Sequence, residues 1–251
     1  MLPAYLVYSM AKVGIPVLIS LTIGIVAGGL LGVAIERTFV RPLRKVSPTA
    51  QTVGTVAALG LLVSISGKIW GTGTLPAPTV FPDLYFQVSS SSLRYGQVGL
   101  FLVMLLVAGG LTALLQFTDF GLAMRGAADN RRAASLLGVD PDVATSGAWA
   151  IGGCTAAIAG ILLAAVTNLN PLTLSLQAIP AFVAALLGGL GSLYGAVVGA
   201  GIVGLTIGVV PAFGTLQRVQ GIQQFILTII ALAVMATRGQ RYAAGDIRSG
   251  L

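Results

Sequence analysis

The stretch "VGIPVLISLTIGIVAGGLLGVAIERTFVRPLR", Val13–Arg44, decides the fold because a long apolar run ends abruptly in basic residues. The run at 13–35 is long enough to cross a bilayer, which takes about 20 residues as a helix. Gly24, Gly28 and Gly32 fall four residues apart, so they form one smooth ridge on such a helix. Ridges of small residues let membrane helices approach closely. The stretch therefore predicts a membrane span that packs tightly on a neighbour.

The rest of the chain repeats this composition. Of its 251 residues, 56% are hydrophobic and 8% are charged, whereas a soluble domain averages about 25% charged residues. The apolar runs predict an all-α polytopic bundle, a single transmembrane domain over residues 1–251. The seven expected spans are 13–35, 50–70, 96–116, 143–166, 176–191, 194–211 and 221–237, and the pair within 176–211 could instead be one broken or re-entrant element.

The basic residues indicate how these spans are oriented. Ten of the 14 Lys and Arg residues fall in the loops 36–49 and 117–142 and in the tail after residue 237. The positive-inside rule places those segments in the cytoplasm, with the N-terminus outside. The loop 71–95 is rich in Pro and Ser and is expected outside. Membrane orientation thus accounts for the net charge of +7, and no nucleic-acid partner is expected.

Several kinds of chemistry have no residues to support them. The chain has no histidine and one cysteine, Cys154, which excludes a disulfide framework and a Cys/His metal cluster. The stretch "SGKI" at 66–69 fails as a phosphate-binding loop, because Leu62 and Ile69 occupy its Gly and Ser/Thr positions. No acidic residue lies within a predicted span, although Glu36 lies at a boundary. We therefore expect no catalytic, metal-binding or cofactor-binding residue. The absence of an intramembrane acid counts against an ion-coupled carrier.

A charged segment interrupts the apolar sequence at 121–142, "GLAMRGAADNRRAASLLGVDPD". Thr118 or Asp119 can cap a helix at its start, and Gly138 can follow its end in a left-handed conformation. The pattern predicts a short amphipathic helix within 118–138. It could lie in the lipid headgroups or dock on a protein. Its alanines and balanced charge favour docking, but the residues alone leave both open.

The charged side chains of this helix are predicted to pair with one another. Arg125 and Asp129 are four residues apart, and Asp129 and Arg132 are three apart. Those spacings put side chains on one helix face. Apolar contacts of the helix are expected from Leu122, Ala133, Leu136 and Leu137.

Three separated motifs resemble one family, the branched-chain amino acid permeases of ATP-binding-cassette importers. "MRGAADNRRAASLLGVDPD" (124–142) is similar to its cytoplasmic coupling segment, and "ERTFVRPLR" (36–44) to its first basic loop. "NPLTLSLQAIPAFVAALLGGLGSLYGAVVGA" (170–200) is similar to its Asn-Pro segment and glycine-rich stretch. The motifs occur in order over nearly the whole chain. The chain departs from the family in lacking its N-terminal segment before "MLPAY" and in having Ala236 where proline is common.

The resemblance implies a multi-pass subunit of a bacterial-type plasma (inner) membrane. Its partners would be a second permease subunit, two cytoplasmic ATPase subunits that bind ATP and Mg²⁺, an extracytoplasmic binding protein and membrane lipid. The implied substrates are branched-chain or related hydrophobic amino acids, with urea or short amides as alternatives. The residues implied to engage the ATPase are Arg125, Asp129, Asn130, Arg132, Ala134, Leu137 and Gly138.

Polar residues near span ends or in broken segments are the candidates for a substrate path. Serine and threonine in membrane helices often bond to their own backbone instead. The candidates are Ser64, Thr155, Asn168, Asn170 and Gln177.

A second glycine ridge, Gly191, Gly195 and Gly199, lies within 176–211. Both ridges predict close helix packing. The sequence leaves open whether the ridges also slide during a transport cycle.

Overall fold

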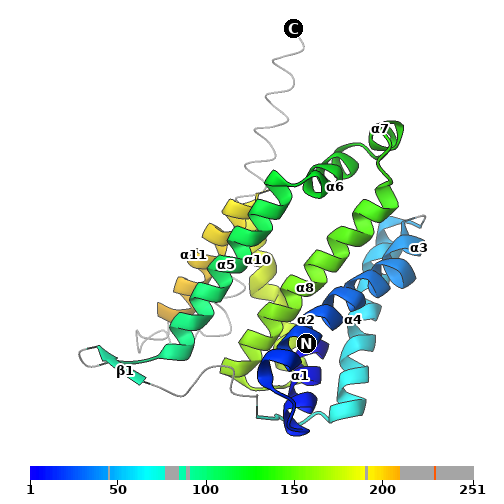
Figure 1. The fold of residues 1–251 in the computed structure, drawn as a ribbon. Helices are drawn as coiled ribbons and strands as arrows, with labels where there is room; N and C mark the ends of the chain where they lie inside the picture. The colour runs from blue at the N-terminus through cyan, green and yellow to red at the C-terminus, as the bar shows by residue number, and fades with distance from the viewer. Residues whose placement is uncertain (45, 77–84, 89–90, 190–191, 210–228, 230–251) are drawn as a thin grey trace. The chain divides into compact units, whose positions relative to one another are not determined.

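The computed structural model describes residues 1–44, 46–76, 85–88, 91–189, 192–209 and 229. They belong to two compact units, Met1–Ser175 and Leu176–Leu251. The described elements are helices apart from one short hairpin (Figure 1), and five of the described helical segments are long and apolar enough to cross a membrane. The predicted class, a polytopic helical membrane protein, is confirmed. The predicted span 221–237 lies outside the described residues except for Ile229, and the single domain over 1–251 stays a prediction.

The elements of the first unit run from α1 to α9, and the last residue of α9, Leu176, is the first residue of the second unit. In chain order they are α1 (Leu2–Lys12), α2 (Val17–Ile35), the π-helical turn η1 (Glu36–Val40), α3 (Arg41–Leu43), α4 (Pro48–Trp70), β1 (Tyr85–Val88), β2 (Ser91–Arg94), α5 (Tyr95–Phe117), α6 (Asp119–Asp129), α7 (Arg131–Leu136), α8 (Pro141–Thr167) and α9 (Pro171–Leu176); α10 (Ala178–Gly188) and α11 (Leu193–Val209) belong to the second unit.

The first span differs from its predicted limits at both ends. It begins at Val17, because Gly14 turns the chain with φ +89° and Pro16 starts the helix. It then continues through η1 and α3, so the apolar helical segment is Val17–Leu43. Most of the predicted loop 36–49 is therefore helical.

The π-helical turn lies directly before Pro42. A proline inside a helix cannot donate to the carbonyl four residues earlier, and its ring collides with that carbonyl. In η1 the N–H of Arg41 bonds instead to the carbonyl of Glu36, five residues earlier. This wider turn carries the helix past Pro42. π-Helical turns of this kind frequently occur at functional sites.

Helices α2 and α8 lie side by side along most of their length (Figure 1). Gly28 faces α8 so closely that a Cβ atom there would lie 2.7 Å from the carbonyl oxygen of Gly153 and would overlap Ala157. A Cβ atom on Gly32 would overlap the backbone of Trp149. The two helices therefore meet backbone to backbone. We call this contact the glycine seam (Gly28, Gly32, Gly153).

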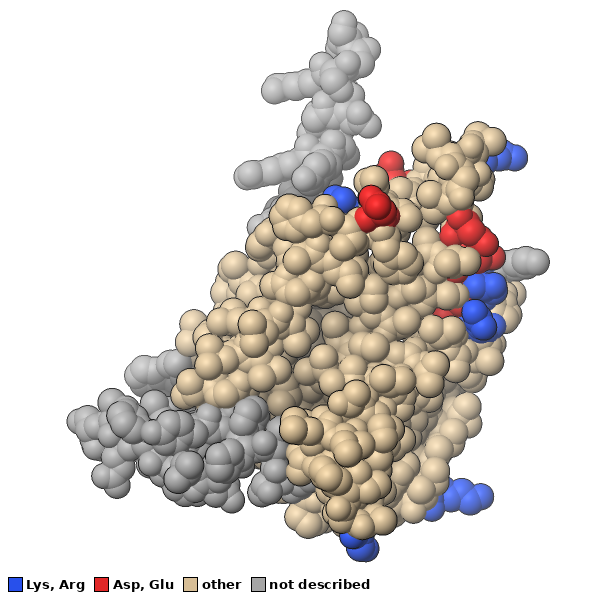
Figure 2. All heavy atoms as spheres, in the orientation of Figure 1, with Lys and Arg blue, Asp and Glu red and all other residues tan. Residues whose placement is uncertain are grey.

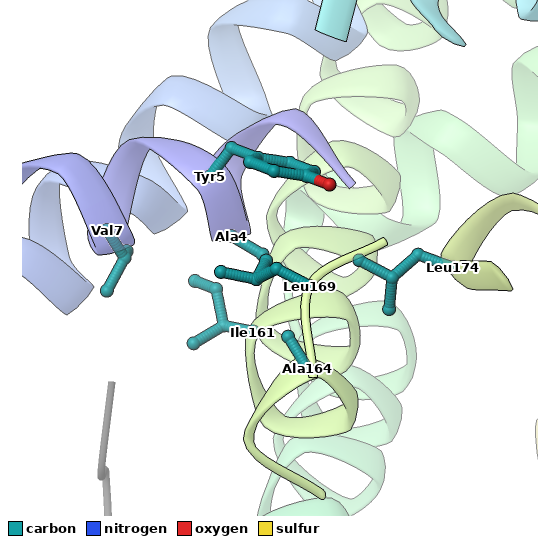
Figure 3. Close-up of a cluster of buried hydrophobic side chains, with 7 residues drawn as sticks. All are labelled: Ala4, Tyr5, Val7, Ile161, Ala164, Leu169 and Leu174. Atoms are coloured by element: carbon teal, nitrogen blue, oxygen red, sulfur yellow. The ribbon is translucent and has the colours of Figure 1, made fainter. Parts of the chain in front are cut away.

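A buried apolar cluster lies where α1 packs against the C-terminal part of α8 (Figure 3). Side chains from α1, from α8 and from the segment through α9 converge there, and Leu169 is completely buried. The ring of Tyr5 lies 5.2 Å from that of Trp70, and its buried hydroxyl group has no hydrogen-bond partner in the described part of the chain. The buried members are Ala4, Tyr5, Val7, Ile161, Ala164, Leu169 and Leu174.

The predicted outer loop is fixed at its beginning. Leu75 and Leu169 exchange two backbone hydrogen bonds, each 2.9 Å long. Within the same loop β1 and β2 pair antiparallel as a hairpin. The turn after α8 that carries Leu169 is thereby joined to the first residues of the loop.

In the described part of the second unit, α10 and α11 pack on each other. A Cβ atom on Gly195 would overlap the backbone of Gly188, and one on Gly199 would overlap that of Ala184. These pairings make α10 and α11 antiparallel. Gly191, the third member of the predicted ridge, lies outside the described residues.

The expected span 176–191 begins earlier than predicted, at Pro171. Asn170 caps α9 by accepting from the N–H groups of Leu172 and Thr173 at 3.0 and 3.1 Å. The helix is interrupted between Leu176 and Ala178 before α10 continues. The expected span 194–211 corresponds to α11, a shorter apolar helix.

Candidate functional site

The predicted amphipathic helix within 118–138 is two helices, so the prediction of one continuous helix is wrong. α6 ends at Asp129 and α7 begins at Arg131, with Asn130 between them in an extended conformation. The Asn130 side chain accepts hydrogen bonds from the N–H groups of Arg132 and Ala133 at 3.1 and 3.0 Å. Asparagine is a preferred cap at a helix start, and here it starts a second helix inside a sequence with helical periodicity.

Both outer ends of this pair of helices are capped as predicted. Thr118 accepts a 3.1 Å hydrogen bond from the N–H of Gly121 at the start of α6. After α7, Gly138 has φ +83°. The N–H of Val139 bonds to the carbonyl of Ala134 at 3.0 Å, and the N–H of Gly138 bonds to that of Ser135 at 3.2 Å. This is the Schellman arrangement. It gives α7 a fixed end.

α6 is attached to its neighbours through small residues. Gly121 packs against the backbone of α5, where a Cβ atom would lie 2.5 Å from the carbonyl oxygens of Leu114 and Leu115. The ring of Phe120 lies against Gly147 of α8. These contacts fix the corner at which α5 turns into α6.

The predicted ion pairs of the segment do not form. Among the described residues, no ion pair involves Arg125, Asp129 or Arg132, and all three are exposed. The neighbouring Arg131 pairs instead with Asp142 in the first turn of α8, at 2.6 Å. The break at Asn130 places Asp129 and Arg132 on different helices, which explains why that pair does not form. Arg125 and Asp129 share α6, and their exposed side chains still do not pair.

The apolar side chains of α7 divide into two sets. Ala134 is buried with Ala127 of α6 and Ala144 of α8. Leu136 and Leu137 are each 84% exposed. The predicted apolar contacts of these two leucines are therefore absent within the described chain, and they form an uncovered apolar tip beside the unpaired charges.

A buried carboxylate lies near this segment. Glu36 of η1 is 0% exposed. Its carboxylate accepts from Arg41 at 3.2 and 3.3 Å, from Arg44 at 3.0 Å and from the Ser146 hydroxyl group at 2.9 Å. A buried charge is tolerated only when it is paired and hydrogen-bonded, and Glu36 meets both conditions.

The sequence contained a weak signal for this pairing. Glu36 and Arg41 are five residues apart, which on an ordinary α-helix would put them on different faces. The π-helical turn before Pro42 brings them together. The signal was therefore a proline inside a basic stretch, and it was weak because basic residues around a proline are also typical of a loop.

Asp142 joins these groups into one network. It pairs with Arg44 at 3.3 Å, with Arg41 at 3.7 Å and with Arg131 at 2.6 Å. We call these five residues, Glu36, Arg41, Arg44, Arg131 and Asp142, the ion-pair network. Figure 2 shows basic and acidic side chains gathered where η1, α3, α7 and the start of α8 lie, while the helix flanks are uncharged. The network connects the end of α2 to α7 through the start of α8.

The candidate path residues are not brought together by any contact in the described chain. Ser64 and Thr155 donate to carbonyls of their own helices, Gly60 at 2.8 Å and Gly152 at 2.9 Å. Asn168 is exposed and has φ +66° at the end of α8. The Asn170 side chain caps α9 and also donates to Thr74 at 3.5 Å. Gln177 precedes α10 and belongs to the second unit. Their role in a path stays a prediction.

The chain matches known proteins over most of its length. The family described as "Branched-chain amino acid transport system / permease component" matches residues 1–235. The branched-chain amino acid transport permease LivH of Salmonella typhimurium is 29% identical over 224 residues, 85% of this chain and 70% of the relative. BraD of Pseudomonas aeruginosa is 32% identical over 198 residues, 76% of this chain and 62% of the relative.

An archaeal protein is similar over a longer stretch. The probable branched-chain amino acid transport permease LivH of Methanocaldococcus jannaschii is 29% identical over 250 residues, 94% of this chain and 78% of the relative. No solved structure matches the chain.

Proposed function

The chain belongs to the family of branched-chain amino acid transport permease components, and from that premise we propose that it is the membrane subunit of an ATP-driven importer for leucine, isoleucine and valine. It receives the amino acid from an extracytoplasmic binding protein and releases it into the cytoplasm across a bacterial-type inner membrane. It pairs with a second permease subunit and with two cytoplasmic ATPase subunits. ATP and Mg²⁺ bind to those ATPase subunits, and this chain carries the path.

The single observation that supports this proposal is the surface of α6 and α7. The pair of helices is capped at both outer ends, Leu136 and Leu137 are each 84% exposed, and Arg125 and Arg132 of the same segment are exposed and form no ion pair with any described residue. A rigid segment with an apolar tip and free charges suits docking on a protein, because exposed apolar groups rimmed by polar ones mark interaction sites. The basic residues of this segment favour a cytoplasmic location by the positive-inside rule, and the cytoplasm is the compartment of an ATPase.

The relatives that the chain resembles support the proposed substrate. LivH and BraD are named for transport of branched-chain amino acids. Urea, short amides and an ion-coupled mechanism are alternatives that an uptake experiment separates. In proteoliposomes whose ATPase subunits face the lumen, leucine uptake should require ATP in that lumen. Uptake that follows an ion gradient without ATP, or uptake of urea and not leucine, would overturn the proposal.

Two variants test the docking surface. Gly138→Val forces a β-branched residue into a conformation with φ +83°, which costs about 1–2 kcal/mol, roughly tenfold in an equilibrium. Arg125→Glu reverses an exposed charge. Both should insert normally, because neither residue lies in an apolar span. Both should reduce co-purification of the ATPase subunits, and Gly138→Val should reduce it about tenfold.

A matched control is Gly60→Val in α4, where an added Cβ atom meets nothing within 4 Å. This control should retain normal co-purification. Normal ATPase binding and full leucine uptake in both Gly138→Val and Arg125→Glu would return the segment to its other interpretation, an amphipathic pair of helices resting on the membrane surface.

A further inference from the structure

The connection between α7 and α8 contains little apolar packing. Ala134 of α7 and Ala144 of α8 are buried together with Ala127 of α6, and Met124 and Val139 pack against these three alanines. The fully buried side chains are all alanines, which bury little area. The chain between the helices is short and turns at Gly138 with φ +83°. A force applied to Leu136 and Leu137 at the exposed end of α7 would therefore rotate α7 about the Gly138 turn, unless a contact at the first residue of α7 opposes the rotation.

The other end of α7 is held by an ion pair. Arg131, its first residue, donates to Asp142 at 2.6 Å and to the Thr145 hydroxyl group at 3.4 Å. This contact spans the Gly138 turn, because Arg131 precedes the turn and Asp142 follows it. Its two side chains are 48% and 47% exposed, so water screens the pair and it adds little to stability.

The carboxylate of Asp142 is also connected to the end of α2, through Arg41 and Arg44. Arg44 binds Asp142 at 3.3 Å with one nitrogen and Glu36 at 3.0 Å with another. Arg41 bridges the same two carboxylates, at 3.7 and 3.2 Å. Ser146 of α8 donates directly to Glu36 at 2.9 Å. Two helix ends and α7 thus share one continuous set of charged contacts.

We propose that the Arg131–Asp142 ion pair is a brace that fixes α7 to α8, and that Arg41 and Arg44 extend this brace to Glu36, so that α7, α8 and the end of α2 move as one body. This inference rests on the proposed function, because it assigns to the brace the transmission of ATPase movement to the spans. Arg131 and Asp142 are positioning residues: they hold α7 in the orientation in which movement is passed on. The exposed brace matters for coupling, while the buried contacts of Glu36 matter for stability.

The test uses the complete transporter in proteoliposomes, with both permease subunits, the ATPase subunits and the binding protein. Radiolabelled leucine uptake and ATP hydrolysis are measured on the same sample, and their ratio is the readout. Arg131→Gln should lower leucine transported per ATP about tenfold, within the range of allosteric coupling. Co-purification of the ATPase subunits and the melting temperature should stay unchanged. Arg131→Lys keeps one charged donor and should keep most of the ratio.

Two further variants make the result specific. Asp142→Asn should lower the ratio at least as much as Arg131→Gln, and the double variant should be no worse than Asp142→Asn, because contacts in one network are not additive. Arg37→Gln is the matched control, since Arg37 is exposed in the same turn as Glu36 and forms no ion pair with any described residue. It should behave as the unmodified chain.

The outcomes separate this inference from the proposed function. Failure of the unmodified complex to take up leucine would reject the proposed function. Leucine uptake in the unmodified complex with the same ratio in Arg131→Gln would reject the brace. Loss of ATPase binding in Arg131→Gln would also reject it, because Arg131 would then be a direct docking residue.

Discussion

Helices α2 and α8 are held together in two different ways along their length. At the glycine seam Gly28, Gly32 and Gly153 bring the two backbones into contact. At the charged end Glu36 and Ser146 join them through hydrogen bonds and ion pairs. The seam lies within the apolar spans, where lipid offers no hydrophobic drive and close packing supplies the attraction. The charged end lies where the spans stop and charged residues gather.

The difference separates two properties of the same helix pair. Backbone contact at the seam depends on shape, so any added side chain disturbs it. The charged end depends on complementary groups, so its exposed members can be changed with little loss of stability. The seam therefore determines whether the two helices associate, and the charged end determines what moves with them. The following predictions test that division.

Removal of the buried carboxylate should have the largest effect on stability. Glu36→Ala removes the buried acceptor that Arg41, Arg44 and Ser146 share and leaves the two arginines with Asp142 as their remaining carboxylate among the described residues. Breaking a fully buried pair costs up to about 3–5 kcal/mol in free energy of unfolding. The arginine side chains are 38% and 29% exposed, so water compensates in part and the low end, about 3 kcal/mol, is expected. Thermal unfolding of the chain in detergent measures it.

Asp129→Ala is the control for this prediction, because Asp129 is exposed and forms no ion pair among the described residues. It should leave the unfolding midpoint unchanged. An equal and small shift in both variants would mean that the carboxylate of Glu36 does not hold the end of α2.

A bulky residue at the seam should have the next largest effect. Gly28→Leu places a side chain where even a Cβ atom lies 2.7 Å from the carbonyl of Gly153. Overpacking of this kind costs about 1–3 kcal/mol. Gly152→Leu changes α8 at a position where a Cβ atom meets nothing within 4 Å. A lower yield of monodisperse protein for Gly28→Leu than for Gly152→Leu is expected, and equal yields would contradict the seam.

The smallest expected effect concerns the second unit. Gly195→Leu should separate α10 from α11, because an added Cβ atom overlaps the backbone of Gly188. The cost is again about 1–3 kcal/mol, but only this one pair of helices is affected. Gly201→Leu on α11 is the control, since its Cβ position is open. Assembly of the complex should fall for Gly195→Leu alone. Unchanged assembly and uptake would show that Gly195 is not part of an interface.

Hydropathy was sufficient to predict the fold class because lipid imposes one requirement on every span. A run such as that of α8 must satisfy its backbone internally and therefore forms a helix. The limits of the spans were less predictable. The helix of α2 continues to Leu43, because a π-helical turn accommodates Pro42, and no periodicity in the apolar residues reports such a turn.

The charged segment also combines features that the sequence predicts with features that it does not predict. Its caps, Thr118 and Gly138, were predictable because capping depends on one residue and its immediate neighbours. Its ion pairs were not, because Arg131 and Asp142 lie on helices whose relative orientation depends on the Gly138 turn. Asn130 was a recognisable cap, but its position inside a helical pattern hid the break. Local chemistry was readable in the sequence, whereas contacts across turns were not.

α8 has a consequence for the far side of the membrane. Its 27 residues make a rod about 40 Å long, which exceeds the roughly 30 Å hydrocarbon core of a bilayer. One tip carries Asp142, and just beyond the other tip Leu169 is joined to Leu75 by two hydrogen bonds. A tilt of about 5° sweeps the far tip of such a rod through an arc of about 3 Å. The start of the loop that follows α4 is thus connected to the charged end of α8 by one continuous helix, without any relay of side chains through the bilayer.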